Sequence, residues 1–495
     1  MRIYPGRSPY HLYALSNAAS LIALISYPIV VEPYLSLTGQ GRIWSLGYLF
    51  FARLAAYGTI RILRSRPVSQ PAVRISSAIA EQARRPNAKE ITLWISLSAC
   101  ASVLLLATTS HITQEVAVIP FLWILPLTIY LGTFILAFSG ERGYSRQIYS
   151  ILFFLTTLLY GWALVRGANV GLPLEMELAV FSLALFFGCM ICHGELYRLR
   201  PHPKYLTSFY LMVSIGGAVG GLLINFVASY LFQGYWELPL GYFLCWSLFI
   251  VVAAGTRTSR IPEWRFILNN GMLGSALIIS GALAVQFIHA DLIGSLGSWR
   301  NFYGVVRVQQ SGSPGQALYN YRLVHGITVH GFQFPLPDQR ALATTYYSPQ
   351  SGVGLAILHH PKYGANMRVG VLGLGIGTLA TFGQPGDVYR FYEINPVVIH
   401  LMEGQGGYFS YLKDRRASIE VVSGDARLSL EQELAQGHPQ DYDVLVLDVF
   451  SSDSIPVHLL DQEAFSLYLQ HLQTGGILAI NISNRYLNLV PVVWT

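Results

Sequence analysis

Acidic side chains stand at the ends of successive apolar runs in the C-terminal half of the chain. Glu393, Asp425 and Asp448 each lie at or just beyond the end of a run rich in β-branched and aromatic residues. If these runs are parallel strands, the three carboxylates share the sheet edge at which open α/β sheets bind ligands. There a carboxylate can hold a ribose or take a proton from a nucleophile. One such Asp alone is often a helix cap or turn residue, but three together favour a site.

A glycine-rich turn precedes the first of these acids. The apolar run Val369–Leu372 leads directly into Gly373-Leu-Gly375-Ile-Gly377. This pattern is typical of a buried strand that meets a tight turn, where the backbone must approach a ligand closely. Glu393 stands 16 residues beyond Gly377, about where an acid at the end of the next strand can accept both ribose hydroxyls. The alternative is a glycine-rich turn that binds no ligand. A nucleoside site is favoured because a strand precedes the turn, a helix is expected after it, and Glu393 stands at the right distance.

Five apolar runs would form the sheet that positions these groups: residues 369–372, 388–392, 418–422, 442–449 and 476–482. We expect them to be parallel strands of a Rossmann-like α/β domain over residues 351–495. Residues 299–350 predict a small β subdomain, because two β-rich runs flank the turn Ser-Gly-Ser-Pro-Gly at 311–315. This subdomain could cap the ligand crevice. Its His325 and His330 could be metal ligands, although ordinary strand histidines are the favoured interpretation.

The N-terminal part of the chain has the composition of a membrane domain. Hydrophobic residues make up 53% of the chain and charged residues only 12%. Residues 1–298 carry 20 Lys and Arg against 11 Asp and Glu, a net charge of +9, whereas residues 299–495 carry 12 against 15, a net charge of −3. We therefore place the boundary of a multi-pass α-helical membrane domain near residue 298. A negative second half suits a cationic small molecule, although three charges are few.

Nine apolar runs in this first domain are long enough to cross a bilayer: approximately 12–35, 43–63, 91–110, 116–138, 147–165, 176–193, 206–232, 238–255 and 267–288. The first has no small-residue cleavage site, so we interpret it as a retained helix. Glycines at four-residue spacing between Ser214 and Gly221 favour close helix packing over a transport role. The run 267–288 contains Asn269 and Asn270, and it is the one we suspect of not crossing.

Basic connections between these runs predict an orientation, which leaves a conflict. Arg and Lys gather in 61–90 and near Arg142, Arg198 and Arg257, and such connections face the cytoplasm. With nine spans, the C-terminal domain would then lie outside, away from cytoplasmic nucleosides. One run does not cross, or a span is missing from the count, or the domain is extracytoplasmic; the sequence leaves these alternatives open.

All four cysteines, Cys100, Cys189, Cys192 and Cys245, fall in the apolar runs. This placement predicts neither a disulfide framework nor a thiolate zinc cluster. The tetrapeptide Cys192-His-Gly-Glu195 looks like a fragment of a metal site, but a helix end is the favoured interpretation because its ligands would need partners from elsewhere.

The C-terminal part resembles the spermidine synthase (polyamine aminopropyltransferase) family. The whole chain resembles bacterial membrane-fused spermidine synthase-like proteins, which carry a transporter-like membrane domain and a class I methyltransferase-type α/β domain. Four segments carry the resemblance: Ser8-Pro-Tyr-His-Leu-Tyr-Ala-Leu-Ser-Asn17, His193-Gly-Glu-Leu196, Arg300-Asn-Phe-Tyr-Gly304 and Leu447-Asp-Val-Phe-Ser-Ser-Asp-Ser-Ile-Pro456.

The resemblance implies a role for each site residue toward a decarboxylated S-adenosylmethionine donor. Gln333 and Glu393 would hold the ribose and the methionine-derived end, and Asp425 with Ala426 would hold the adenine. The turn of Gly373, Gly375 and Gly377 would contact the donor through its backbone. Tyr346 or Tyr347 would line the amine pocket, and Asp448 and Asp453 would handle the acceptor.

The chemistry explains why acids are needed. A neutral amine attacks the carbon beside a sulfonium, while the far end of a diamine stays charged. Asp448 is our candidate for the base that takes the proton, and Asp453 is our candidate for the anchor of the distant ammonium.

Four features depart from the family pattern. Soluble members have Gly-Gly-Gly-Asp-Gly at the turn, with an Asp that contacts the donor amine, and Ile376 stands at that place. The usual Glu-Ile-Asp reads Glu393-Ile-Asn395, and the acidic pair is five residues apart instead of three. The chain also stops at Thr495, soon after the fifth strand, so we expect a C-terminally truncated form.

Three functions follow as alternatives. The first is a membrane-tethered aminopropyltransferase that uses decarboxylated S-adenosylmethionine and a di- or polyamine. The second is a methyltransferase that uses S-adenosylmethionine, and the third is a non-catalytic nucleoside or polyamine sensor on a transporter-like bundle. We expect no metal and no nucleic-acid partner. We expect an integral protein of the bacterial inner membrane, surrounded by a lipid bilayer. Whether it forms a homo-oligomer is left open.

Overall fold

A computed structural model of the chain describes residues 11–64, 84–116, 122–170, 172–255, 263–326, 328–449 and 456–482. The chain divides into two compact units. The first comprises residues 1–109, 121–224 and 237–283, and the second comprises residues 110–120, 225–236 and 284–495. The last part of the second unit begins at residue 284, so it includes the end of the last long helix, and the expected boundary near residue 298 stays a prediction.

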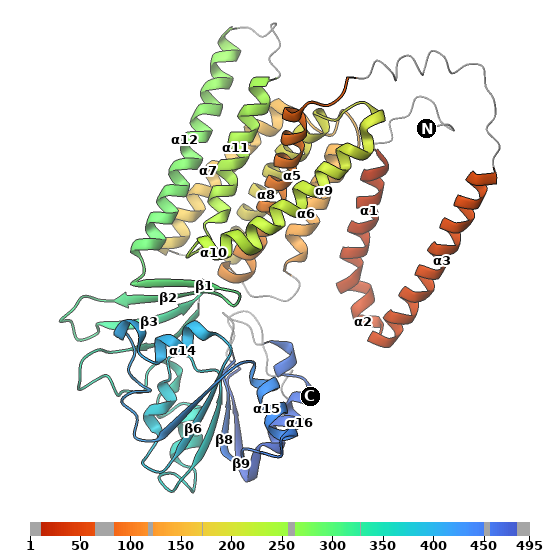
Figure 1. Cartoon of the computed structure of the whole chain (residues 1–495). Coiled ribbons are helices and arrows are strands. Elements are labelled where there is room, and N and C mark those ends of the chain that lie inside the picture. The colour runs from red at the N-terminus through yellow and green to blue at the C-terminus, as the bar shows by residue number, and fades with distance from the viewer. Residues whose placement is uncertain are drawn as a thin grey trace, which may run out of the picture. The chain divides into compact units, whose positions relative to one another are not determined.

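The regular elements of the described N-terminal part of the chain are all helices (Figure 1). Its elements are α1 (His11–Ser26), η1 (Tyr27–Val31), α2 (Glu32–Tyr34), α3 (Leu37–Arg64), α5 (Ala88–His111), η3 (Ile112–Val116), α6 (Ile124–Phe138), α7 (Arg146–Val170), α8 (Leu174–Arg198), η4 (Pro203–Tyr205), α9 (Leu206–Leu222), η5 (Leu223–Ala228), α10 (Ser229–Leu231), α11 (Glu237–Gly255) and α12 (Glu263–Ile293). Helix α6 packs against α1 and α8, and α7 packs against α8.

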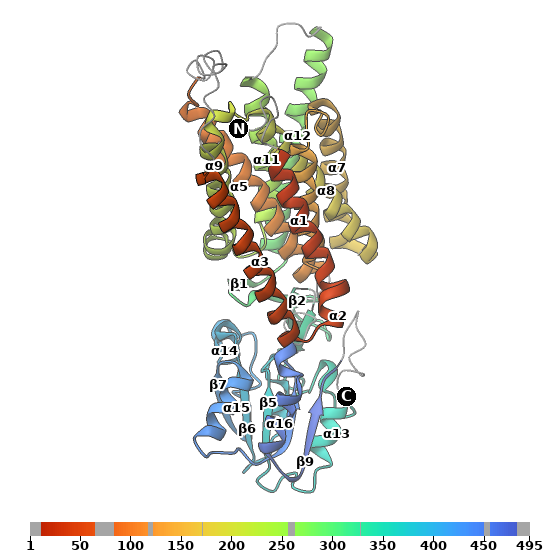
Figure 2. The same cartoon turned by 90° about the vertical axis from the view of Figure 1, so that its right-hand side faces the viewer.

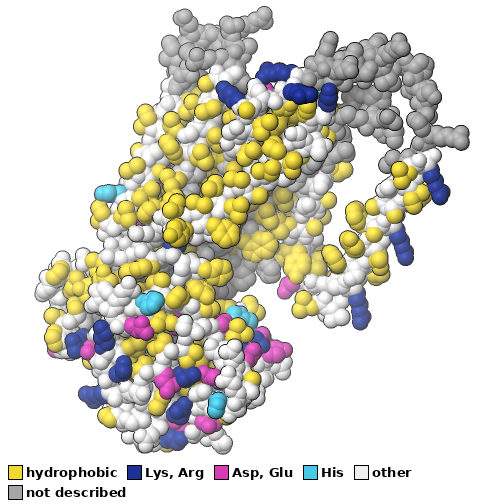
Figure 3. Space-filling model, in the orientation of Figure 1, with side chains coloured by type: hydrophobic (Ala, Val, Ile, Leu, Met, Phe, Trp, Pro, Cys, Tyr) yellow, Lys and Arg dark blue, Asp and Glu magenta, His cyan; other side chains and the backbone are white. Residues whose placement is uncertain are grey.

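Seven helical segments among the described residues are long and apolar enough to cross a membrane: Ala14–Tyr34, Ala88–Gln114, Arg146–Leu164, Leu174–Arg198, Pro203–Leu231, Glu237–Gly255 and Gly271–Ile293. The last of these contains most of the run that we suspected of not crossing. The expected span 43–63 lies in α3, which is outside this set, and the expected span 116–138 contains the shorter apolar α6. Nine spans thus stay a prediction. Hydrophobic side chains are spread widely over the visible face of the helical part in Figure 3.

Glycines bring two of these helices into backbone contact. A Cβ at Gly216 would overlap the carbonyl oxygen of Ile95, and a Cβ at Gly220 would overlap that of Ala99. Because these glycines are one turn apart on α9, they form a groove into which α5 packs directly. The close helix packing expected from the glycine spacing is thus present between α5 and α9.

The second unit contains a parallel sheet of five strands: β5 (Arg368–Leu372), β6 (Val388–Glu393), β7 (Ser418–Ser423), β8 (Tyr442–Leu447) and β9 (Leu472–Ile480). Their spatial order is β7-β6-β5-β8-β9. The chain therefore changes direction across the sheet between β5 and β8, which opens a crevice at the carboxyl ends of these two strands. All five expected strands are present.

Helices cover both faces of this sheet (Figures 1 and 2). Every residue of β8 is buried: Val444 and Val446 join the core on one face, and Leu445 and Leu447 join the core on the other. The first core includes residues of α13 (Gly352–Leu358), η7 (Thr378–Phe382) and α14 (Pro396–Met402), and the second includes residues of α15 (Ala426–Ala435) and α16 (Gln462–Gln470). Burial on both faces explains the continuous apolar runs in the sequence.

The helix expected after the glycine turn is instead the five-residue 3₁₀ helix η7. Gly377 begins it in the left-handed conformation (φ +77°), and Gly383 ends it in an extended one. Pro385 follows shortly after and cannot continue a helix. A 3₁₀ helix of this length lacks the extended helix dipole that binds the phosphates of dinucleotides.

Four strands precede the parallel sheet and form an antiparallel sheet in the order β1-β2-β3-β4. They are β1 (Gly297–Asn301), β2 (Gly304–Ser311), β3 (Asn320–His325) and β4 (Thr328–Gln333). Val306, Val308 and Leu323 of this sheet belong to the same buried core as Val369 and Val371 of β5. The antiparallel sheet therefore shares a core with the parallel sheet, and both belong to the second unit.

Candidate active site

Gly373 and Asp448 meet where β5 and β8 end. The backbone N–H of Asp448 donates to the carbonyl of Leu372 at 2.9 Å. Gly373 has φ +96°, and a Cβ there would overlap the carbonyl oxygen of Asp448. Only glycine allows this close approach of two strand ends, because it tolerates the positive φ and adds no side chain. The glycine turn and the candidate base thus share the crevice where the strand order reverses.

A cavity of about 240 Å³ opens at this crevice. Six of the residues predicted from the sequence line it: Gly373, Gly375, Glu393, Asp425, Ala426 and Asp448. Apolar contacts come from residues such as Val306, Leu323, Val398 and Leu459. A largely apolar cavity with a few converging polar groups is the usual form of a small-molecule site.

Backbone groups orient the carboxylate of Glu393 at the end of β6. Its Oε2 accepts the N–H of Leu374 at 3.1 Å, and its Oε1 accepts the N–H of Asn395 at 2.8 Å. Burial raises the pKa of Glu393, while these backbone hydrogen bonds oppose the rise and the nearby charge of Asp448 adds to it. Each oxygen keeps a second lone pair, so the carboxylate can still accept a hydroxyl from the cavity.

Asp425 has two partners at the start of α15. Its Oδ1 accepts the N–H of Leu428 at 3.0 Å as a helix cap, and its Oδ2 lies 3.1 Å from Nε2 of His458. His458 belongs to η9 (Val457–Leu459) and lines the cavity beside Asp425. We did not predict His458 from the sequence, because it is 33 residues from Asp425 and no motif connects them.

Asp448 is held by three side chains from distant parts of the chain. Its Oδ2 accepts hydroxyls from Tyr347 and, at 3.3 Å, from Tyr346; its Oδ1 accepts the amide of Asn481 at 2.8 Å. Burial raises the pKa of Asp448, and the three hydrogen bonds work against the rise. Burial and the charge of Asp448 also raise the pKa of both tyrosines, so their hydroxyls stay protonated and donate.

Tyr346 and Tyr347 line a second hollow, of about 340 Å³, together with Asn481. Residues of α13, such as Val353, and of β9, such as Ala479, form its walls. Asp448 lines the first hollow, and its carboxylate accepts hydrogen bonds from Tyr346, Tyr347 and Asn481, which line the second.

Two predicted site residues line neither hollow, and a third cannot be placed. Gln333 does not line the first cavity: its amide donates to the carbonyl of Arg340 at 2.7 Å and to Oγ of Ser410 at 3.1 Å. Gly377 has φ +77°, and a Cβ there would press on Leu412. Asp453 lies outside the described residues.

The end of the cavity near the β subdomain has no carboxylate from the glycine turn. Ile376 is buried in the core and faces Gly331, where a Cβ would overlap its side chain. Tyr303, His325 and His330 line the cavity on that side. Burial lowers the pKa of both histidines, that of His330 to about 3, so both rings are neutral at pH 7. In the described part of the chain, the buried Nε2 of His330 has no hydrogen-bond partner.

Comparison with known proteins yields partial likenesses. No protein-family model matches the chain. A probable polyamine aminopropyl transferase of Bifidobacterium longum is 27% identical over 181 residues, which cover 34% of this chain and 36% of that protein. A polyamine aminopropyltransferase of Vibrio vulnificus is 31% identical over 139 residues, 27% of this chain and 43% of that protein.

A third likeness is to an N-terminal histidine N-methyltransferase of Emericella nidulans, 34% identical over 122 residues, 24% of this chain and 21% of that protein. The chain spans less than half the length of each of these curated relatives. Together they support a spermidine synthase-like family and, coarsely, a transferase of the aminopropyl or methyl type with a substrate of the S-adenosylmethionine class.

Proposed function

We propose that the α/β unit is an aminopropyltransferase of the spermidine synthase type, tethered to a membrane by the helical part of the chain. It would transfer an aminopropyl group from decarboxylated S-adenosylmethionine to a di- or polyamine. The observation that carries the proposal is the convergence of Glu393, Asp425 and Asp448 on one cavity. The likeness to two polyamine aminopropyltransferases supports the same reaction class.

The donor's nucleoside would occupy the first cavity. Glu393 would accept the ribose hydroxyls, Asp425 and Ala426 would border the adenine, and the backbone of Gly373 and Gly375 would lie against the donor. The strand order supports a Rossmann-like domain of the class I methyltransferase type, in which ligands bind at the point where the order reverses. The short 3₁₀ helix after the turn suits a nucleoside without phosphates better than a dinucleotide.

The reaction would be an in-line displacement at the carbon beside the sulfonium. The amine nitrogen forms a bond to this carbon, the carbon–sulfur bond breaks, and its electron pair neutralises the sulfur. The nitrogen becomes positive and releases a proton, for which Asp448 is the proposed acceptor. Most of the rate gain would come from holding the two reactants in line.

The second hollow would admit the acceptor amine. Tyr346, Tyr347 and Asn481 hold Asp448 at its border, so the carboxylate would meet the amine nitrogen there. Asp453 stays our proposed anchor for the distant ammonium, at a position outside the described residues. Neutral aromatic walls beside one carboxylate suit a cation that loses a proton as it reacts.

A methyltransferase is the second candidate, because one observation favours it. Ordinary S-adenosylmethionine carries a carboxylate at the end where the glycine turn offers Ile376 instead of an acid. A carboxylate of the turn would repel it, whereas a neutral His330 with an unpartnered ring nitrogen can donate a hydrogen bond to it. The partial likeness to a methyltransferase is consistent with this alternative.

Titration calorimetry on the full chain in detergent separates the candidates. We expect decarboxylated S-adenosylmethionine to bind at least tenfold more tightly than S-adenosylmethionine, and Glu393→Gln to weaken both. Glu403→Gln, an exposed acid on the chain after α14, is the matched control. Preference for ordinary S-adenosylmethionine would favour the methyltransferase, and binding of neither would leave a non-catalytic unit.

The seven long apolar helices support an integral membrane protein, and we propose a lipid bilayer, that of the bacterial inner membrane, as its surroundings. Protease accessibility of residues 299–495 in sealed vesicles would show which side they occupy. A homo-oligomer remains a proposal that cross-linking in the same vesicles would test.

A further inference from the structure

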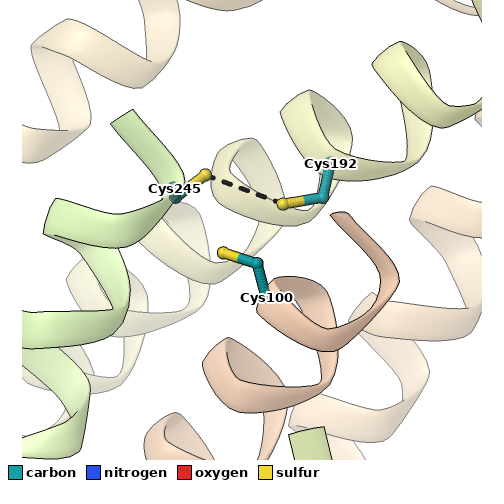
Figure 4. A group of neighbouring side chains, drawn as sticks. All are labelled: Cys100, Cys192 and Cys245. Atoms are coloured by element: carbon teal, nitrogen blue, oxygen red, sulfur yellow. Dashed lines mark hydrogen bonds between the residues drawn. The ribbon is translucent and has the colours of Figure 1, made fainter. Parts of the chain in front are cut away.

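Three of the chain's four cysteines meet inside the helical unit (Figure 4). Cys100 lies on α5, Cys192 on α8 and Cys245 on α11. Their sulfur atoms all lie within 4.8 Å of one another, and those of Cys192 and Cys245 are 3.7 Å apart. Each residue is at most 1% exposed. The convergence comes from three separate helices, so it is invisible as a motif in the sequence.

The spacing of the three sulfurs is close to what one metal ion needs. With metal–sulfur bonds of about 2.3 Å, ligand sulfurs stand roughly 3.8 Å apart in a tetrahedral site and roughly 4.0 Å apart in a trigonal one. The observed separations, 3.7 Å for one pair and no more than 4.8 Å for the others, require only small side-chain movements to reach either value. Thiolate ligands select soft ions such as Cu(I), and also Zn(II).

The other metal-binding side chains nearby are outside this group of three sulfurs. Cys189, one turn before Cys192 on α8, places its sulfur 3.9 Å from the carbonyl of Ala101. The Nδ1 of His193 lies 3.1 Å from the hydroxyl of Thr133, whereas its buried Nε2 has no hydrogen-bond partner among the described residues. The buried Glu195 pairs with Arg146. The described residues therefore offer three sulfurs and no fourth ligand in the same group. Structural zinc takes four protein ligands, so a site with three sulfur ligands fits a monovalent ion better than zinc.

The environment also favours a single positive charge. The surrounding helices are apolar, and a buried net charge is costly there. When a monovalent ion binds, one S–H bond breaks, one metal–sulfur bond forms from that thiolate, and one proton leaves to water. While the other two cysteines stay protonated, the charge of the site does not change; each of them that also binds the ion as a thiolate releases one more proton to water and adds one negative charge. A divalent ion would have to displace two protons for the same balance.

Simple packing is the competing explanation, because buried cysteines often act as small apolar residues. In the structure, Cys100 and Cys245 make weak contacts to backbone carbonyls: Cys100 to Gly241 at 3.9 Å and Cys245 to Gly188 at 3.7 Å. Such contacts need no cysteine, since serine or alanine would fit the same space. Packing does not explain why three of the four cysteines meet at one point.

We propose that Cys100, Cys192 and Cys245 form a binding site for a monovalent soft metal ion of the Cu(I) class. The bound ion ties α5, α8 and α11 together at one point. Because the site lies in the helical unit, it is independent of the nucleoside cavity and of the reaction proposed there.

The test uses the full chain in detergent, reduced and kept free of oxygen, with Cu(I) supplied as its bathocuproine disulfonate complex. We expect the wild type to take one Cu(I) per chain from the chelator and to melt at a higher temperature when loaded. Single Cys→Ser substitutions at 100, 192 and 245 should each weaken uptake at least tenfold. Cys189→Ser is the matched control, a buried cysteine on the same helix, and should leave uptake unchanged.

Three results would overturn the proposal, and all of them are obtained with the wild-type protein. They are a wild type that takes up no Cu(I), a wild type that prefers Zn(II), and a mass spectrum showing that Cys192 and Cys245 are joined as a disulfide in the purified protein. Where the serine variants do fold, unchanged uptake in all three would have the same meaning. Donor binding at the α/β unit is measured in parallel and should not depend on the metal.

Discussion

The hydroxyl of Tyr347 donates a hydrogen bond to Oδ2 of Asp448, across 101 residues of sequence. Tyr346 and Asn481 complete a set of three donors around the same carboxylate. Burial would otherwise drive this group toward its protonated form, so the three donors keep it closer to a usable base. The predictions below follow from this arrangement and from the glycine turn beside it.

Asp448→Asn should reduce turnover at least about a hundredfold and leave donor binding within a factor of about three, because it removes a base without emptying the nucleoside cavity. Turnover and calorimetry on the same preparation measure both effects. Asp443→Asn is the control, a buried acid at the other end of β8 that pairs with Lys362. It should lower stability but spare the turnover of folded protein; equal turnover in Asp448→Asn and wild type would refute the role of the base.

The same substitution should not destabilise the protein at neutral pH. The pKa of Asp448 is raised in the folded state. The contribution of this group to stability is therefore fully present only below the pKa that it has in the unfolded chain. That contribution is lost as the pH rises through the folded-state pKa. The midpoint of denaturant unfolding at pH 5 and pH 8 checks this sign: the variant should gain relative to wild type at the higher pH.

Tyr347→Phe should move the acid limb of the turnover profile to higher pH. The hydroxyl of Tyr347 lowers the pKa of Asp448 and so opposes the effect of burial. Without it the pKa rises further, and Asp448 stays protonated to higher pH. At neutral pH we expect turnover about tenfold below wild type, the value of one hydrogen bond to a charged group. Tyr389→Phe is the control, because in the described residues its buried hydroxyl has no partner. A profile that coincides with wild type would contradict the assignment.

Gly373→Ala should abolish donor binding and destabilise the α/β unit by more than about 2 kcal/mol, since it adds both a strained φ and an overlap with the Asp448 carbonyl. Gly437→Ala separates the two effects. Gly437 also has a positive φ, +76°, but no atom lies within 4 Å of a Cβ there. The control should cost only about 1–2 kcal/mol and bind donor normally, as chemical denaturation and calorimetry would show.

Ile376→Asp should destabilise the unit by about 3 kcal/mol or more without improving binding of decarboxylated S-adenosylmethionine. The side chain at this position faces Gly331 in the core, so a carboxylate there is buried and unpaired. Ile376→Val, which keeps the site apolar, should cost only about 1 kcal/mol. Tighter donor binding by the Asp variant would mean that this side chain can reach the cavity after all.

Local patterns in the sequence were sufficient for the strands and for part of the site. Runs of apolar residues located all five parallel strands; in a central strand such as β8, burial on both faces leaves a continuous apolar signal. Gly373, Glu393 and Asp448 could be placed at one sheet edge, because the carboxyl ends of parallel strands always share it. The 3₁₀ helix after the turn was missed, since its early end depends on Gly383 and the following proline instead of on the apolar pattern.

Residue types within a few positions of each other were enough to divide the chain into an apolar helical part and an α/β part. They also located the strands of the sheet and the three acids at its edge. The folded chain was needed to show that Tyr347 and Asn481 hold Asp448, that His458 pairs with Asp425, and that Cys100, Cys192 and Cys245 meet. Such contacts join segments tens of residues apart, and they exist only because packing of the whole chain brings those segments together.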